Sequence, residues 1–381
     1  MISPEFKRFP NEWKVLPFLE VFEDVTSKGK KVKKENYQIT GDIPVVDQGQ
    51  KFFGGYTDEA NKITGVDLPA IVFGDHTKAF KYVEVDFAIG ADGVKLLNPK
   101  IDADKKFLFY YLKQLKLEDA GYSRHFKFLK ETYIPLPPLE TQKKIAAVLE
   151  RADQLRKDCQ QMEQELNSLA QSVFIDMFGD PVTNPKGWEM KALSDLAIIV
   201  TGNTPSRAKP EYYGSYIEWI KSGNINTPSD YLTIAEEYLS ESGKKVGRVV
   251  QSGSVLMTCI AGSPDCIGNV AIADREVAFN QQINALVPIE KKLNTDFLYI
   301  LLKVAKKIIQ SASTNSMKGM ISKSKLESIQ LPFPSYDEQC DFSAIYRKLQ
   351  KVVKEQQKQV IETELMFNSL MQKAFKGELT L

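Results

Sequence analysis

Apolar residues recur at alternating steps of three and four along two long segments of the chain, residues 139–178 and 336–376. In the first segment the repeating positions are Ile145, Val148, Ala152, Leu155, Cys159, Met162, Leu166, Leu169 and Val173. In the second they are Tyr346, Leu349, Val353, Gln356, Val360, Thr363, Phe367, Leu370 and Ala374, with Gln356 and Thr363 as polar interruptions. Charged and amide residues fill much of the remainder. This heptad spacing predicts two long helices that pair through apolar seams, as in a coiled coil.

The two segments are also copies of one another. Ser168–Phe174 matches Ser369–Phe375 at a displacement of 201 residues. A proline-containing phrase precedes each predicted helix, Leu136-Pro137-Pro138-Leu139-Glu140-Thr141-Gln142 and then Leu331–Gln339, and the glutamines that end the two phrases are displaced by 197 residues. The second helix is therefore expected to carry four extra residues near its start, where the copies should not superimpose. Gly179 and Gly377 follow the helices as expected stop signals.

Chain connectivity predicts the direction of the pair. The first helix leads from one globular region to the next, so a second helix that packs against it must run back. We therefore expect an α+β fold with two mixed α/β heads, residues 1–135 and 182–330, separated by antiparallel coiled-coil helices in a pseudo-two-fold repeat. The alternative is that both helices are amphipathic parts of one large α/β core.

Short β-rich runs punctuated by glycine fill both heads. The expected strands are residues 43–46, 70–73, 82–85, 94–97, 254–258, 269–273 and 285–288, and residues 107–117 and 296–309 are expected to be helical. Sequence similarity between the heads is weak, whereas the helices match well. Two diverged heads are expected to bind the same kind of ligand with different detail.

Composition narrows the class of protein. The 381 residues suffice for two or three domains, and the formal net charge of +1 means that nucleic-acid binding would depend on local patches. Four cysteines without a C-x-x-C pair and only two histidines disfavour a zinc site and a disulfide framework, and favour a reduced cytoplasm. No apolar run approaches 18 residues, so a membrane span is not expected.

Motifs for catalysis are missing from the sequence. There is no G-x-x-x-x-G-K-[ST] phosphate loop, no G-x-G-x-x-G between a strand and a helix, no Asn/Asp-Pro-Pro-Tyr-like methyltransferase motif and no evident Pro-Asp…Glu-x-Lys nuclease cluster. We therefore expect no catalytic, cofactor-binding or metal site in this chain.

Local clusters of cations, aromatic residues and amides suit DNA. Lysines can pair with phosphates, asparagine and glutamine can bond adenine, and arginine or lysine can bond guanine. The candidate DNA contacts of the first head are Lys28, Lys30, Lys31, Lys33, Lys34, His76, Lys78, Arg124, His125 and Lys127. Those of the second head are Arg207, Lys221, Asn224, Asn226, Asn280, Gln281, Gln282, Asn315 and Lys318. Solvated turns would have the same composition, so that alternative stays open.

Taken together, the repeated phrase, the heptad helix that it opens, Phe178-Gly179-Asp180-Pro181 and Gly187-Trp188 resemble the specificity subunit of Type I restriction–modification systems. In the second head, residues 202–206, 219–225 and 279–283 resemble the target-recognition domains of that family. The second copy departs from the pattern at Leu331–Tyr336, where two extra residues enter.

The resemblance implies a division of labour. Each head would read half of a split site in double-stranded DNA, and the helices would set the spacer and dock two methyltransferase subunits. Two motor-nuclease restriction subunits would join the complex. S-adenosylmethionine, ATP and Mg would belong to these partners, and this chain would be non-catalytic. The alternatives are a protein-binding scaffold, a stand-alone two-headed DNA-binding regulator, and an active nuclease–methyltransferase fusion, which the missing motifs disfavour.

Overall fold

The computed structural model describes residues 9–90, 93–118, 123–314 and 319–380. The chain forms two compact units, one made of residues 1–160 and 358–381 and the other of residues 161–357. Both long helices cross this division. Each unit therefore combines one head with a portion of each helix, whereas the sequence predicted heads and helices as separate segments.

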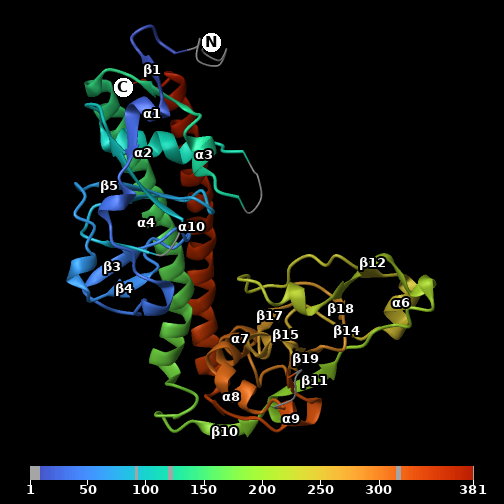
Figure 1. The fold of residues 1–381 in the computed structure, drawn as a ribbon. Coiled ribbons are helices and arrows are strands. Elements are labelled where there is room, and N and C mark those ends of the chain that lie inside the picture. The colour runs from blue at the N-terminus through green and yellow to red at the C-terminus, as the bar shows by residue number, and fades with distance from the viewer. Residues whose placement is uncertain (1–8, 91–92, 119–122, 315–318, 381) are drawn as a thin grey trace. The chain divides into compact units, whose positions relative to one another are not determined.

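The long helices are α4 (Leu139–Phe178) and α10 (Tyr336–Lys376), coloured green and red in Figure 1, and they occupy the ranges predicted from the heptads. Gly179 and Gly377 follow them with φ of +81° and +74°, the left-handed conformation that favours glycine. α4 has 40 residues and α10 has 41. The two lengths are nearly equal although α10 begins four residues earlier in the repeat. The reason is that α4 continues for one further turn beyond Phe174, whereas α10 ends one residue after the equivalent Phe375.

Within each unit the two helices lie antiparallel. In the first unit, Arg156 of α4 pairs with Glu364 of α10 at 2.9 Å and lies over the ring of Phe367. In the second unit, Phe174 of α4 packs against Phe342 of α10, with ring centroids 5.4 Å apart. The first part of α4 therefore contacts the last part of α10, and the last part of α4 contacts the first part of α10, as predicted.

The predicted seam of α10 is not exposed to solvent. Its nine positions are all buried or half-buried, including the polar Gln356, which is only 6% exposed.

On α4 only some of the predicted seam positions are buried or half-buried. Ile145, Val148, Ala152, Cys159, Leu166 and Val173 are buried or half-buried. Leu155, Met162 and Leu169 are 47%, 51% and 41% exposed, so their assignment to the seam is wrong. The residues one position later than these three, Arg156, Glu163 and Ala170, are buried or half-buried instead, and Leu149 is buried next to Val148. The inward face of α4 thus steps by four and then three, and it includes polar residues that a search for apolar positions rejects.

The head in the first unit contains two main sheets and a peripheral pair. Their strand orders are β2-β8-β5-β6, β4-β3-β7 and β1-β9. The strands are β1 (Lys14–Pro17), β2 (Phe22–Asp24), β3 (Ile43–Val46), β4 (Gly55–Thr57), β5 (Ala70–Gly74), β6 (Phe80–Val83), β7 (Ala88–Ile89), β8 (Val94–Pro99) and β9 (Tyr133–Leu136), and the helices are α1 (Phe18–Val21), α2 (Lys105–Gln114) and α3 (Phe126–Leu129).

The head in the second unit repeats this plan, with strand orders β11-β19-β15-β17, β13-β12-β18-β14 and β10-β21 and an added pair β16-β20. Its strands are β10 (Glu189–Ala192), β11 (Ala197–Thr201), β12 (Tyr213–Ile220), β13 (Tyr238–Leu239), β14 (Val249–Val250), β15 (Val255–Thr258), β16 (Ile260–Ala261), β17 (Val270–Ile272), β18 (Val277–Phe279), β19 (Ile283–Pro288), β20 (Gly319–Met320) and β21 (Gln330–Phe333). Its helices are α5 (Leu193–Leu196), α6 (Glu241–Val246), α7 (Thr295–Val304), α8 (Lys306–Ser311) and α9 (Lys323–Glu327).

The heads are therefore more alike in topology than in sequence. Each places one parallel pair in its second sheet, β3 beside β7 and β12 beside β18. The strands expected from sequence are present within two or three residues, and the predicted helix over residues 296–309 is divided into α7 and α8 at Ala305.

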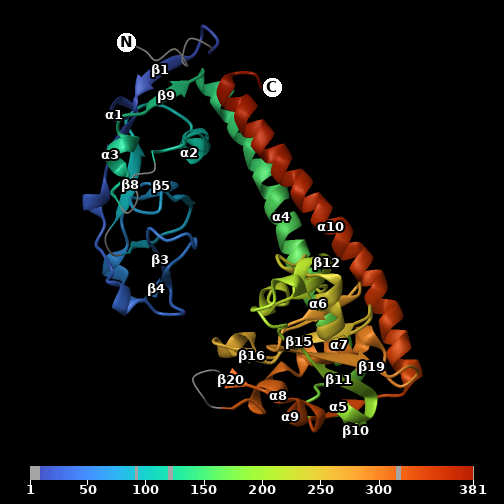
Figure 2. The ribbon, with the colours of Figure 1, turned by 90° about the vertical axis from the view of Figure 1, so that its right-hand side faces the viewer.

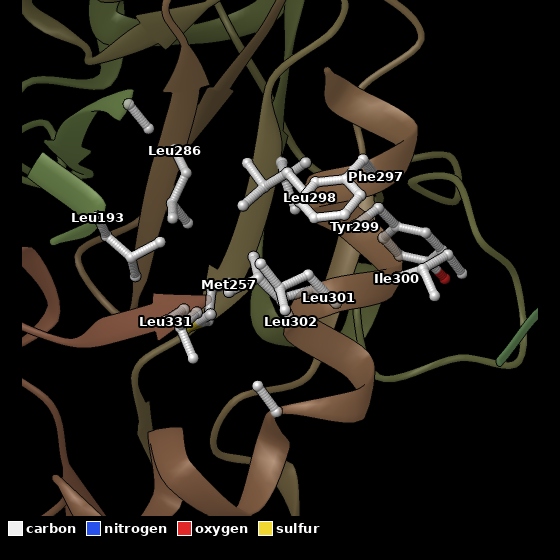
Figure 3. Packing of buried hydrophobic residues seen from close by; sticks show 14 of the residues in the cluster. Leu193, Met257, Leu286, Phe297, Leu298, Tyr299, Ile300, Leu301, Leu302 and Leu331 are labelled. Atoms are coloured by element: carbon white, nitrogen blue, oxygen red, sulfur yellow. The ribbon is translucent and has the colours of Figure 1, made fainter. Parts of the chain in front are cut away.

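One helix of each head packs on the long helices. In the first unit, Phe107 and Tyr111 of α2 contact the ring of Phe375 of α10, and Ile145 of α4 belongs to the same core. In the second unit, Phe297 of α7 contacts Phe174. Figure 2 shows α7, α8 and α9 near the strands of the second head, and Figure 3 shows residues of α7 packed with Met257 of β15 and Leu331 of β21.

Among the described residues, neither a candidate membrane-spanning helix nor a candidate metal-binding cluster is present. None of the helices in that part of the chain combines the length and the apolar character that a membrane span requires. No three His, Cys, Asp or Glu side chains among the same residues are grouped so that they could hold a metal ion.

Candidate nucleic-acid interface

Corresponding loops meet at one edge of the second sheet in each head. Because β3 and β7 are parallel, their carboxyl ends adjoin, and the N–H of Gly90 donates to the carbonyl of Val46 at 2.8 Å. In the second head, the N–H of Asn280 donates to Ile220 O at 3.0 Å in the same way. Carboxyl ends of parallel strands are a common place for ligand-binding loops. This edge of each head is the candidate interface.

In the first head, the loop after β3 is tied to the loop after β5. The hydroxyl of Thr77 donates to Gln48 O, and Gln48 Oε1 accepts from the N–H of His76 at 3.3 Å. Gln50 Nε2 donates to Thr77 O at 3.4 Å. In the same loop, Asp47 O accepts a hydrogen bond from the ammonium group of the buried Lys81 at 2.8 Å. These bonds bring the predicted His76 and Lys78 together with a loop that the sequence analysis passed over.

The residues that were missed are Gln48, Gln50 and Lys51. All three belong to the loop after β3, and Gln50 and Lys51 are exposed. The amide-rich run Asp47-Gln48-Gly49-Gln50 is the signal that could have found them, because the same kind of run was noted in the second head.

The lysine run of the first head is held by one apolar residue. Val32 is 1% exposed, and its N–H donates to Ile89 O of β7 at 2.9 Å. Lys28, Lys30, Lys31, Lys33 and Lys34 are all exposed. Lys33 lies 3.9 Å from the carboxylate of Glu35, and both side chains are exposed. The run therefore places cations beside the strand that leads to the candidate edge.

The structure contradicts the prediction that His125 contacts DNA. This histidine is fully buried, and its Nδ1 lies 3.0 Å from Asp75 O, so this nitrogen carries the proton and donates. The Asp75 carboxylate also accepts from the N–H of Phe126 at 2.7 Å. The prediction that His125 contacts DNA is wrong because its ring fixes the start of α3. Its neighbours Arg124 and Lys127 are exposed and stay predictions.

In the second head, two predicted cations share one carboxylate. Arg207 pairs with Glu237 at 2.6 Å, and Lys221 pairs with the other oxygen of the same group. The guanidinium of Arg207 also lies over the rings of Tyr213 and Trp219, at 4.3 and 5.1 Å. Hydrogen bonds from Lys221 and Arg207 hold the pKa of Glu237 below its usual value. The structure thus brings together Arg207 and Lys221 on an aromatic platform.

The predicted amides of the second head differ in role. Asn224 Nδ2 donates to Ile234 O at 3.0 Å, and Asn226 Oδ1 accepts from Asn269 at 2.9 Å, so both side chains are engaged inside the head. Asn280 is 7% exposed and its side chain bonds within its own loop, so direct base contact by Asn280 is wrong.

Gln281 is the outward amide of this loop. It is exposed, it bonds to the hydroxyl of Thr204, and the half-buried Gln282 follows it. Gly202 allows the loops to approach, since a Cβ there would lie 2.1 Å from Asn280 O. The candidates Asn315 and Lys318 lie outside the described residues.

The family model for the Type I restriction modification DNA specificity domain matches residues 10–168 and 185–363, nearly the whole chain and both copies of the repeat. The chain belongs to this family. The predicted resemblance is therefore confirmed, and the α+β fold with its internal repeat is the fold of a Type I specificity subunit.

The chain matches named specificity subunits over different shares of its length. It is 26% identical over 351 residues to the Type I restriction enzyme EcoR124I/EcoR124II specificity subunit of Escherichia coli, covering 86% of this chain and 84% of that one. It is 33% identical over 140 residues to the HindI specificity subunit of Haemophilus influenzae, covering 36% of this chain and 28% of the other.

Solved structures share the fold. The crystal structure of a Type I restriction-modification S subunit from M. genitalium matches with a TM-score of 0.61 and 16% identity, covering 98% of this chain and 99% of that one. A chain from a structure on complex assembly and conformational transition of the type I R-M system matches with a TM-score of 0.59 and 18% identity, covering 97% and 99%.

Proposed function

We propose that this chain is the sequence-specific DNA-recognition subunit of a Type I restriction–modification complex, in which each head reads one half of a bipartite DNA site. The observation that carries the proposal is the repeat of strand order with different loop residues. The equivalent edge carries Gln48, Gln50 and Lys51 in one head and Lys221 and Gln281 in the other. A shared scaffold with different polar side chains suits two related but different half-sites.

The exposed apolar residues of the long helices support docking of methyltransferase subunits. In the second unit, Met162 and Leu169 of α4 and Ile345 and Val352 of α10 recur at seven-residue spacing and are 41–53% exposed. A free helix surface rarely keeps such a stripe unless another helix covers it. We assign these exposed apolar residues of α4 and α10 to contacts with helices of the methyltransferase subunits.

The proposal leaves chemistry to the partners. This chain would position DNA and would be non-catalytic. Two methyltransferase subunits would use S-adenosylmethionine, and two motor-nuclease subunits would use ATP and Mg. The matches to named specificity subunits favour this assignment over a protein scaffold or a stand-alone regulator.

Co-expression tests the proposed function. The chain would be produced with the methyltransferase encoded beside its gene, and methylated adenines would be mapped by sequencing. The proposal predicts methylation at one split motif, in which a fixed number of unspecified base pairs, the gap, separates the two half-sites. It predicts no methylation when this chain is absent. A continuous motif, or methylation that persists without this chain, would contradict it. Binding of this chain to duplex DNA with full affinity in the absence of partners would favour the stand-alone regulator.

A further inference from the structure

A buried glutamine occupies the same place in both copies of the repeated proline phrase. Gln142 is 3% exposed and Gln339 is 1% exposed. Each lies in the first turn of a long helix. Burial of an amide is costly unless its hydrogen bonds are made, so these two side chains need specific partners.

Their partners are equivalent. Gln142 Oε1 accepts from the N–H of Asp104 at 2.9 Å, and its Nε2 donates to Pro137 O at 2.8 Å. Gln339 Oε1 accepts from the N–H of Asn294 at 2.9 Å, and its Nε2 donates to Pro334 O at 3.1 Å. Gln339 Nε2 also lies 3.4 Å from Lys292 O. Each amide therefore joins the start of a long helix to another segment of the head.

That other segment is a helix N-terminus. Asp104 caps α2, with Oδ1 accepting from the N–H of Phe107 at 2.7 Å. Asn294 caps α7, with Oδ1 accepting from the N–H groups of Asp296 and Phe297. The cap side chain holds the head helix, and the glutamine holds the backbone of the cap. These hydrogen bonds therefore connect the start of each long helix, through the cap residue, to the first turn of the head helix.

The helices held in this way carry each head onto the helix pair. α2 packs through Phe107 and Tyr111, and α7 packs through Phe297. Apolar packing alone is non-directional and tolerates sliding and rotation. A hydrogen bond at the N-terminus of α2 or α7 fixes the angle at which that helix leaves the start of α4 or α10.

We propose that Gln142 and Gln339 are positioning residues that set the orientation of each head on the helix pair, and with it the gap at which the two half-sites are read. This inference rests on the proposed function. It assigns gap selectivity to two buried amides as well as to helix length. Only an amide fits, because the site needs an acceptor toward the cap N–H and a donor toward the proline carbonyl.

Replacement by methionine tests the inference. Gln142→Met and Gln339→Met keep the length of the side chain and remove both hydrogen bonds. Each variant would be assembled with the methyltransferase and given a plasmid library in which the half-sites stand at every gap length. We expect the preference for the native gap over neighbouring gaps to fall about tenfold, and the half-site sequences to stay unchanged. Gln154→Met and Gln161→Met, at exposed amides of α4 in the first and second unit, are the matched controls and should keep the native preference.

Three results would overturn the inference. An unchanged gap preference would do so, as would an equal loss of methylation at every gap, which is what a merely stabilising residue produces. A change in the half-sites would also contradict it. If a methionine variant does not fold, Gln142→Asn and Gln339→Asn replace it, since a side chain one methylene shorter keeps a neutral amide but does not reach both partners, and a loss of gap preference is again expected. A wild-type complex that methylates no split site would refute the proposed function itself, whereas a wild-type split site with unaffected variants refutes only this inference.

Discussion

Glu237 lies between two cations of the candidate interface in the second head. Its carboxylate pairs with both Arg207 and Lys221, the cations of the second head that lie on aromatic rings. A DNA phosphate would compete with this carboxylate for the same donors. We therefore expect Glu237 to limit the attraction of this surface for DNA that lacks the correct sequence.

Removing that charge should strengthen non-specific binding. Glu237→Gln is expected to raise the affinity of the full chain for a short random-sequence duplex. It should also steepen the plot of log affinity against log salt concentration by about one to two, because each phosphate contact adds about 0.9 to the magnitude of that slope. Fluorescence anisotropy at several salt concentrations measures both. Glu241→Gln, which changes the charge equally at an exposed pair with Lys245 3.7 Å away, is the control. Equal effects of the two variants would refute the role of Glu237.

Asp230 joins three elements of the second unit. Its carboxylate accepts hydrogen bonds from Tyr299, Lys303, Tyr346 and Gln350. Burial acts to raise the pKa of Asp230, but the charge of Lys303 and the hydroxyls of Tyr299 and Tyr346 outweigh it, so the pKa lies below its usual value. The ionised carboxylate therefore stabilises the folded second unit.

The pH dependence follows from this direction. An aspartate whose pKa is lowered by folding contributes stability above its unfolded pKa of about 3.9, and loses it as the pH falls through the lower folded pKa. Asp230→Asn should cost about 1–3 kcal/mol of unfolding free energy at pH 7. The difference from wild type should hold down to about pH 4 and shrink below it. Urea unfolding followed by tryptophan fluorescence measures this, and a difference that grows on acidification would contradict the assignment.

Individual candidate residues could be predicted only in part. Sequence identified the exposed lysine run and the pair Arg207 and Lys221, because charged residues seldom lie inside a protein. It failed for His125 and Asn280, which are buried by contacts from distant strands and loops. A single sequence does not contain the tertiary contacts that decide whether a polar side chain faces inward.

At the scale of elements, the long helices were the most predictable part. A periodic pattern sustained over many turns determines their ends well, as Leu139–Phe178 and Tyr336–Lys376 show. The seam of α4 was harder, because Arg156 and Glu163 lie inward while Met162 and Leu169 are exposed. The short strands of the heads pair with residues far away in sequence, so their order could not be read from local pattern.

The exposed apolar residues of α4 lead to a prediction about docking. Met162→Glu with Leu169→Glu should change unfolding free energy by no more than about 0.5 kcal/mol, because both side chains are near half exposed. The same change should weaken co-purification with the methyltransferase by placing charges in the apolar contact. Ser168→Glu, at an exposed polar position of the same helix, is the control. Normal assembly of the double variant would show that this face is not the docking surface.

The two helices should also act as a ruler. One extra helical turn of four residues in each, placed after Lys157 in α4 and after Lys358 in α10, lengthens the pair by about 6 Å. This corresponds to about two base pairs of DNA. We expect the preferred gap to grow by about that amount while both half-sites stay the same. Methylome sequencing that shows altered half-sites and a constant gap would refute the ruler.

At the scale of the whole molecule, repetition occurs at two levels. Sequence repetition is plain in the helices and in the phrase that contains Gln142 and Gln339. Structural repetition extends to the heads, where β2-β8-β5-β6 corresponds to β11-β19-β15-β17. Sequence analysis predicted the first level and underestimated the second, since strand pairing survives substitutions that remove recognisable similarity. Conserved topology with different loops is what independent reading of two half-sites requires.

A head exchange tests this central claim most directly. Residues 1–135 would be replaced by the equivalent head of another family member with a known site, and the methylated sequence would be determined with the same methyltransferase. We expect one half of the split site to change to the donor's half, while the other half and the gap are retained. A change in both halves, or in neither, would contradict the reading of one half-site by each head.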